Sequence, residues 1–156
     1  MGTENVFQDG PYLTAALLCE RILEEKDGVK SLVRVVNRII SKAQGPQVPE
    51  KMPLIQAMLS LYLSMRTGNK SGKHEIRIGF SRPDKTATSL LVQGVNLEPP
   101  ESHGIDLAIN LNLSLDQEGV YWFDVCFDEC LMTKIPLSVI YLTQSEGKNQ
   151  ARSVVQ

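Results

Sequence analysis

Apolar and polar side chains alternate along the C-terminal half of the chain, most regularly over residues 105–115. Every odd position of this segment is apolar, and polar side chains fill most of the even positions. Successive side chains of a β-strand point to opposite faces of a sheet, so this period of two is typical of a half-buried strand. The segment therefore predicts architecture, and it contains no recognisable catalytic motif.

Two further segments continue this alternation after turns at 117–119 and 128–129. They predict two strands with the inward rows Tyr121, Phe123, Val125 and Phe127, and Ile135, Leu137, Val139 and Tyr141. Pro136 has no backbone N–H for a sheet ladder, so we expect the last strand at a sheet edge. An edge strand can accept an extended segment of another protein, which makes Tyr141 a candidate binding residue.

Three segments before residue 98 also predict strands. The odd positions of 55–65 are all apolar, and residues 73–81 alternate in the same way. Residues 86–95 carry apolar side chains on both parities, which predicts burial on both sides or an interface. Turn-forming residues separate these segments, and the three prolines within 41–53 predict a loop.

The segment 12–39 allows two interpretations. Helix-forming residues run as far as Gly28, where a helix would end. Asp27-Gly28 is also a strong hairpin-turn signal, and the residues after it are rich in β-branched side chains. We expect a hairpin over Tyr12–Ile39 and keep a helix as the alternative for Tyr12–Lys26.

About eight predicted strands with turn signals between them indicate an all-β fold. The arrangement that we expect is an antiparallel two-sheet β-sandwich of the Ig-like or C2-like kind. It would occupy residues 11–142 as a single domain, since 156 residues suffice for one core and are short for two. Residues 1–10 would form a flexible lead-in, and the polar segment 143–156 a mobile tail.

The composition excludes two classes of partner and indicates a location. The formal net charge of −2 is unlike the basic charge of most nucleic-acid-binding domains, so nucleic acid is not expected. No run of about 18 apolar residues predicts a membrane span. The N-terminus lacks the features of a signal peptide, and an odd count of three cysteines argues against a disulfide framework. We therefore expect a cytoplasmic protein with reduced thiols.

The residues that most often carry catalysis or bind metals are few and scattered. His74 begins a predicted strand, and His103 lies in a loop. Cys126 and Cys130 flank a hairpin corner, but a zinc site needs about four such ligands at close spacing. No serine or cysteine lies in a nucleophile motif, and there is no glycine-rich phosphate loop. We expect neither an enzyme nor a cofactor.

Acidic residues gather near two predicted hairpin ends, at 116–118 and at 124–129. Calcium sites collect carboxylate and carbonyl oxygens from loops, so acidic loop tips of a sandwich can bind calcium. Turns also favour Asp because its side chain bonds to nearby backbone groups. We favour this second, structural interpretation of the acidic residues.

Trp122 lies on the outward parity of its predicted strand, in the row Val120, Trp122, Asp124 and Cys126. An exposed aromatic side chain is a candidate anchor for a protein or a sugar. The alternative is that the N-terminal segment or the proline-rich loop covers the indole, since amphipathic indoles are often partly buried. Trp122 and Asp124 are therefore candidate binding residues, and no residue is a candidate metal ligand.

Several motifs follow one another along the chain: L-L-C-E-R-I-L-E-E-K-D-G-V-K-S-L-V-R-V-V-N-R-I, G-K-H-E-I-R-I, R-P-D-K, E-G-V-Y-W-F-D-V and I-P-L-S-V. From Leu13 to Val139 they resemble a bacterial family of short single-domain proteins known only as a domain of unknown function. The resemblance implies a small intracellular β-sandwich without a known activity, and it favours the first hairpin over the helix. Family members tend to have a D-G corner where this chain has Asp128-Glu129-Cys130.

Two functions follow as hypotheses. The first is a non-catalytic protein-interaction or structural module that binds a protein partner or self-associates, because two-sided apolar strands occur without a convergent polar site. The second is a C2-like or lectin-like sandwich that binds calcium, an anionic lipid surface or carbohydrate through its acidic tips or Trp122.

Overall fold

The computed structural model describes residues 9–98 and 104–144, which form nine strands and no helix. The predicted all-β fold is therefore confirmed. The strands are β1 (Tyr12–Glu24), β2 (Lys30–Val35), β3 (Arg38–Gln44), β4 (Ile55–Arg66), β5 (Gly72–Ser81), β6 (Ala87–Leu97), β7 (Gly104–Leu115), β8 (Gly119–Phe127) and β9 (Cys130–Gln144). This described part of the chain contains no helix that is long and apolar enough to cross a membrane.

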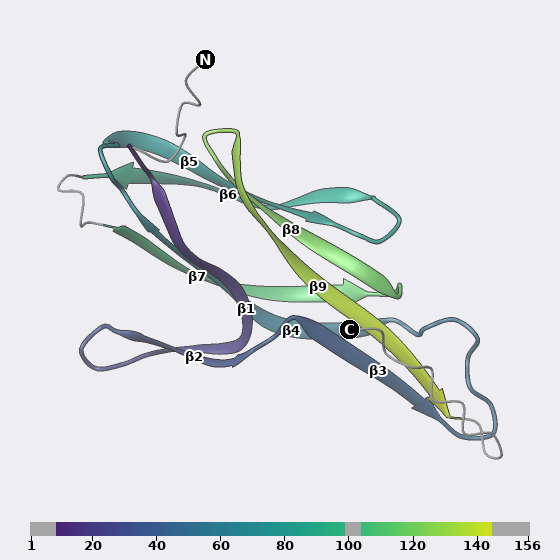
Figure 1. The fold of residues 1–156 in the computed structure, drawn as a ribbon. Coiled ribbons are helices and arrows are strands. Elements are labelled where there is room, and N and C mark those ends of the chain that lie inside the picture. The colour runs from purple at the N-terminus through teal and green to yellow at the C-terminus, as the bar shows by residue number, and fades with distance from the viewer. Residues whose placement is uncertain (1–8, 99–103, 145–156) are drawn as a thin grey trace.

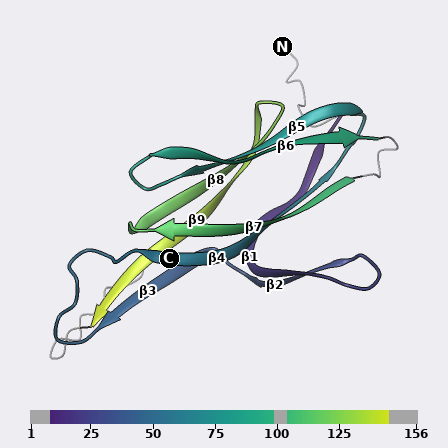
Figure 2. The ribbon, with the colours of Figure 1, turned by 180° about the vertical axis from the view of Figure 1, so that it is seen from behind.

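The strands form two sheets, seen from opposite sides in Figure 1 and Figure 2. One sheet has four strands in the order β2-β1-β4-β7, and the other has five in the order β3-β9-β8-β5-β6. Neighbouring strands are antiparallel except for β3 and β9, which run in the same direction (Figure 1). The predicted antiparallel arrangement is therefore wrong for this one pair, because β3 joins a strand far from it in sequence.

The first hairpin is confirmed, with a turn at Asp27-Gly28. Gly28 has a φ of 84°, in the left-handed region that favours glycine, and Val29 N donates to Asp27 Oδ1 at 3.1 Å. The second arm of the hairpin is shorter than predicted, since β2 ends at Val35 and the chain then crosses to the other sheet as β3. The β-branched residues after the turn predicted one continuous strand, whereas the structure divides them between β2 and β3. The first four residues of the predicted loop at 41–53 also belong to β3.

The last strand is not at an edge, because β9 lies between β3 and β8. The missing N–H of Pro136 nevertheless costs no hydrogen bond of the β3–β9 ladder. Ser138 N donates to Asn37 O at 3.0 Å, so the backbone nitrogen of Pro136, two residues earlier, faces the same side. The β3 ladder begins only opposite Ser138, so Pro136 lies beyond its start. The edge prediction was wrong because proline requires only a local gap in the neighbouring ladder.

Residues 86–95, for which the sequence predicts burial on both sides or an interface, largely form the edge strand β6. Its inward residues Leu91 and Val95 pack against the core, whereas Leu90 and Val92 on the outer face are exposed. Apolar side chains on both parities therefore do not mean two-sided burial here.

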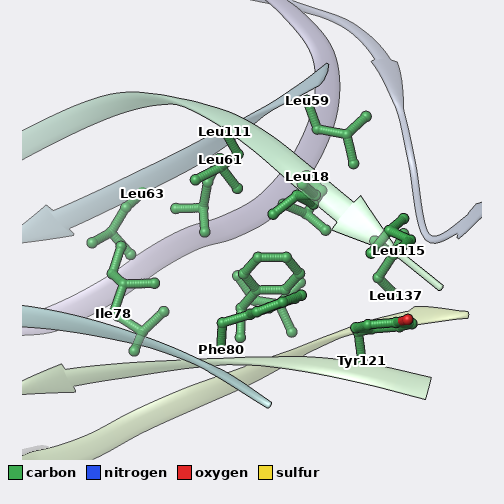
Figure 3. Close-up of a cluster of buried hydrophobic side chains, with 14 of the residues drawn as sticks. Leu18, Leu59, Leu61, Leu63, Ile78, Phe80, Leu111, Leu115, Tyr121 and Leu137 are labelled. Carbon is green, nitrogen blue, oxygen red and sulfur yellow. The ribbon is translucent and has the colours of Figure 1, made fainter. Parts of the chain in front are cut away.

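One hydrophobic core is shared by the inward rows of both sheets. Leu61 and Leu63 of β4 point toward Ile78 and Phe80 of β5 (Figure 3). Phe80 also stacks on Tyr121 with ring centroids 5.5 Å apart. The predicted inward rows of β8 and β9 are all buried, so the two-residue period identified the core side of these strands correctly.

The ends of the domain differ slightly from the predicted range 11–142. Asn69 N donates to Asp9 O at 2.8 Å, so the chain is held in place before residue 11. A Cβ on Gly68 would lie 2.5 Å from the same carbonyl oxygen, which explains the glycine. At the other end, Thr143 and Gln144 belong to β9. The rest of the predicted lead-in and tail lies outside the described residues.

Removal of core volume should destabilise the fold far more than the same change on the outer face of the same strand. Leu61 is fully buried and Met58 is 81% exposed, and both lie on β4. We expect Leu61→Ala to lower the free energy of unfolding by about 2–5 kcal/mol, through lost transfer energy and a residual cavity. Met58→Ala should change it by less than about 0.5 kcal/mol. Urea unfolding of both variants measures this, and equal effects would contradict the assigned core side of β4.

Candidate functional site

Trp122 faces outward from β8, as the alternation predicted, and is 36% exposed. It lies in register with Ser81 of β5 on one side and Pro136 of β9 on the other. Both neighbours have smaller side chains than Trp122, which is consistent with its partial exposure. The outer face of the five-stranded sheet thus carries one large aromatic group at its centre.

Lys134 joins the two predicted residues Trp122 and Asp124 into one cluster. Its Nζ lies 5.2 Å from the centroid of the indole and 3.7 Å from Asp124 Oδ1. A cation over an indole ring is attracted by the negative face of the ring. Lys134 therefore covers one face of the Trp122 ring, and the sequence analysis did not identify this residue.

A β-bulge explains why Lys134 was missed. Counted back from the corner at Phe127 and Cys130, the hairpin would place Thr133 opposite Asp124. The register shifts by one residue between Val125 and Cys126, so that Lys134 lies opposite Asp124 instead. The sequence shows that a lysine is present near this position. It does not show that the lysine faces Asp124 and Trp122, because the residues at the bulge have no clear signature.

Tyr141, the third predicted residue, lies apart from this cluster and is 7% exposed. Its hydroxyl donates to Pro49 O at 2.8 Å, and its backbone N–H donates to Glu118 Oε1 at 3.0 Å. Tyr141 lies opposite Ser41 of β3, and on the other side, where the β8 ladder ends at Val139, the Glu118 side chain occupies its N–H. The contacts of Tyr141 hold the proline-rich loop and the β7–β8 turn against the sheet.

Three acidic residues of the hairpin ends, Asp116, Glu118 and Asp128, bind groups of the chain itself. Asp116 pairs with Arg82 Nη1 at 2.8 Å, and Glu118 accepts the backbone N–H of Tyr141. Asp128 accepts Glu75 N at 2.9 Å. Within 9–98 and 104–144, no group of three His, Cys, Asp or Glu side chains could hold a metal ion.

His74, at one end of β5, contacts other groups through both ring nitrogens and a ring face. Its Nδ1 contacts the Asp128 carboxylate, its Nε2 lies 2.8 Å from Ser71 O, and its ring stacks on Phe127 at 5.0 Å. Both nitrogens thus face acceptors, which suits the doubly protonated ring. The hydrogen bond to Asp128 raises the pKa of His74, and the same bond lowers the pKa of Asp128. His103 lies outside the described residues.

The corner after Phe127 is an unusual turn held by this contact. Asp128 and Glu129 both have positive φ, of 46° and 67°, as in a two-residue hairpin turn of type I′. Glycine usually occupies the second position of such a turn, and here Glu129 does so at a cost in backbone strain. Bonds from the Asp128 side chain to β5 therefore help to stabilise the corner.

None of the three cysteines forms a disulfide among the described residues. Cys19 is buried, and burial raises its pKa and that of half-buried Cys126. Cys130 is exposed and lies opposite Phe127 in register, so it does not face Cys126 directly. A raised thiol pKa lowers the thiolate fraction, so neither Cys19 nor Cys126 resembles an activated nucleophile.

The family of the chain follows from residues 14–140, which match a family described as a family of unknown function, DUF6941. The chain belongs to the DUF6941 family. The match agrees with the resemblance found over residues 13–139, and the DUF6941 region begins within β1 and ends within β9. A comparison with curated proteins finds no match. DUF6941 membership therefore assigns no activity to the chain.

The His74–Asp128 contact should make stability depend on pH. A raised histidine pKa stabilises the fold fully below the ordinary value of about 6.5, and this contribution is lost as pH rises through the folded value. A lowered Asp128 pKa stabilises the fold above about 3.9, and this contribution is lost as pH falls through the folded value. The contact should therefore contribute most between about pH 4 and 6.5.

His74→Gln tests this window, because it keeps a polar side chain and removes the charge. We expect it to lower the free energy of unfolding by about 1 kcal/mol at pH 5 and by clearly less at pH 9, measured by urea unfolding. Asp128→Asn should show the same trend. A cost that is equal at the two pH values would contradict the assigned charge state of His74.

Proposed function

We propose that this protein is a non-catalytic interaction module that binds other proteins through its five-stranded sheet. The exposed apolar side chains of this sheet support the proposal. They are Ile40 of β3, Leu90 and Val92 of β6, Val120 and Trp122 of β8, and Leu131 of β9. Exposed apolar groups mark a protein-binding surface where they lie together, as Val120 and Trp122 do two residues apart on β8.

Small residues connect Trp122 with the open edge of the sheet. Ser81 of β5 lies between Trp122 and Ala87 of β6 in register. Two residues along β5, and on the same face, Gly79 lies between Asp124 and Ser89 in register. No large side chain from these positions of β5 therefore separates the indole from β6, and one partner could contact Trp122 and β6 together.

The outer face of the four-stranded sheet is different, because its polar groups bind one another. Across β4 and β7, Gln56 Nε2 donates to Ser114 Oγ at 2.9 Å, and Ser60 Oγ donates to Asn110 Oδ1 at 3.1 Å. Ser64 Oγ donates to Asp106 Oδ1 at 2.5 Å, and only 4% of the Ser64 residue is exposed. This network occupies polar groups of β4 and β7. The four-stranded sheet also exposes Met58 and Val35, so the choice of the five-stranded sheet rests on Trp122 in its middle strand.

The non-catalytic part of the proposal rests on how the titratable groups are used. Both ring nitrogens of His74 have acceptors within the chain, so neither is open to a substrate. Asp116 and Asp128 are likewise engaged, which also gives no particular support to a calcium-binding C2-like or lectin-like sandwich. Free thiols support a reducing, cytoplasmic location as part of the same proposal.

Truncation of the indole should weaken binding to protein partners. We expect Trp122→Ala to reduce the recovery of proteins that copurify with the tagged chain by at least about tenfold, as for an aromatic anchor worth about 2 kcal/mol. The measurement is quantitative mass spectrometry of the copurified proteins.

Met58→Ala is the matched control, since it removes an exposed apolar group from the other sheet. It should leave recovery unchanged. If Trp122→Ala retains every partner of the wild type, the assignment of this sheet as the binding surface is wrong.

A further inference from the structure

We propose that the partner at the open edge is a second copy of this chain, with the two β6 strands paired antiparallel about a two-fold axis. Two five-stranded sheets would then join into one continuous sheet. This inference rests on the proposed interaction function and names both the surface and the partner. Figure 2 shows β6 at the border of its sheet, next to β5.

The sequence of β6 lacks the usual protection of an edge strand. Edge strands carry charged residues or proline that prevent pairing with other chains. Within the described sheets the other edges follow this rule: β2 carries Lys30 and Arg34, β3 carries Arg38 and Lys42, and β7 carries Asp106. None of the 11 residues of β6 is charged, and none is proline.

The hydrogen bonds of β5 show which backbone groups of β6 remain open. Glu75 O accepts Asp128 N at 2.9 Å, and Glu75 N donates to Asp128 Oδ1 at 2.9 Å, so both groups point away from β6. Gly94 lies opposite Glu75 in register. Such an antiparallel pair exchanges no hydrogen bonds, so the N–H and C=O of Gly94 face the open edge, as do those of Val92 and Asn96.

The side chains of β6 complement a second copy of the same strand. Val92 is the middle residue of Ala87–Leu97, so pairing over the whole strand places Val92 of both copies beside the two-fold axis. Leu90 then lies near Gly94 of the second copy. A Cβ at Gly94 would meet nothing within 4 Å, so there is room for this leucine. Leu90 and Val92, 38% and 52% exposed, would each be partly shielded from water by the neighbouring strand.

The charges that flank β6 favour the antiparallel orientation. Lys85 precedes the neutral strand and Glu98 follows it, and neither forms an ion pair with another described residue. Antiparallel pairing places Lys85 of each copy near Glu98 of the other. Exposed ion pairs add little affinity, but they select orientation and partner. A neutral strand between opposite charges is therefore complementary to itself.

The dimer should be weak. Pairing along one edge buries less surface than the roughly 1,000 Å² of a stable interface, and a dissociation constant on the order of 10 μM is expected. Leu90 lies at a β-bulge, which makes pairing about Val92 less regular beyond Leu91 and weakens the dimer further. Sedimentation of the full chain from about 1 μM to 500 μM therefore covers the transition.

Val92→Lys should raise the dissociation constant by at least about tenfold, because it places two like charges beside the two-fold axis. Met58→Lys is the control, since it adds the same charge on the other sheet and should leave the constant unchanged. Thermal unfolding by circular dichroism verifies that both variants fold. A wild type that stays monomeric at 500 μM, or a Val92→Lys variant that dimerises like the wild type, overturns the inference.

A charge exchange tests the orientation without touching the strand. Lys85→Glu alone and Glu98→Lys alone should each weaken the dimer by roughly three- to tenfold, as two exposed ion pairs become repulsive. The double variant should restore the affinity of the wild type. Failure of this restoration overturns the antiparallel pairing of β6.

The experiments distinguish failure of the proposed dimer from failure of the proposed interaction function. A monomeric protein that loses copurified proteins through Trp122→Ala overturns the dimer and leaves the interaction function standing. A monomeric protein whose Trp122→Ala variant keeps every partner overturns both.

Discussion

The packing of two sheets against one apolar core is the interaction on which the rest of this structure depends. Tyr121 and Phe123 of β8 and Leu61 and Leu63 of β4 are fully buried in this core, and burial of a large apolar side chain contributes about 1.5–3 kcal/mol. Because the period of a strand is two, each residue that enters the core sends its neighbour to the outer face. The core therefore also decides which residues are available for function.

The two outer faces differ in how far they satisfy their own groups. On the four-stranded sheet, Ser60 and Ser64 sit in a hydrogen-bonded network between β4 and β7 and are almost fully buried despite their outward parity. On the five-stranded sheet, Trp122 and Val92 remain exposed, and β6 has a free backbone edge. Unsatisfied apolar and backbone groups are what a partner can bind, so function is proposed for this sheet.

Prediction from the sequence succeeded where one strand alone carries the signal. Alternation assigned the core side of β8 and placed Trp122 and Asp124 outward, and the Asp27-Gly28 turn identified the first hairpin. It failed where the neighbour of a strand matters. Pro136 suggested an edge, but β3 pairs with β9 only from Ser138 onward, so a central strand tolerates this proline.

The sequence by itself determined the all-β class, the core rows and the absence of a recognised catalytic motif, because these depend on local periodicity and residue type. Only the tertiary structure decided that Lys134 covers Trp122, since a bulge shifts the register of β8 and β9 by one residue. It also decided that β6 is an open edge and β9 is not. Strand order depends on contacts between segments far apart in the chain, and alternation within a strand carries no information about them.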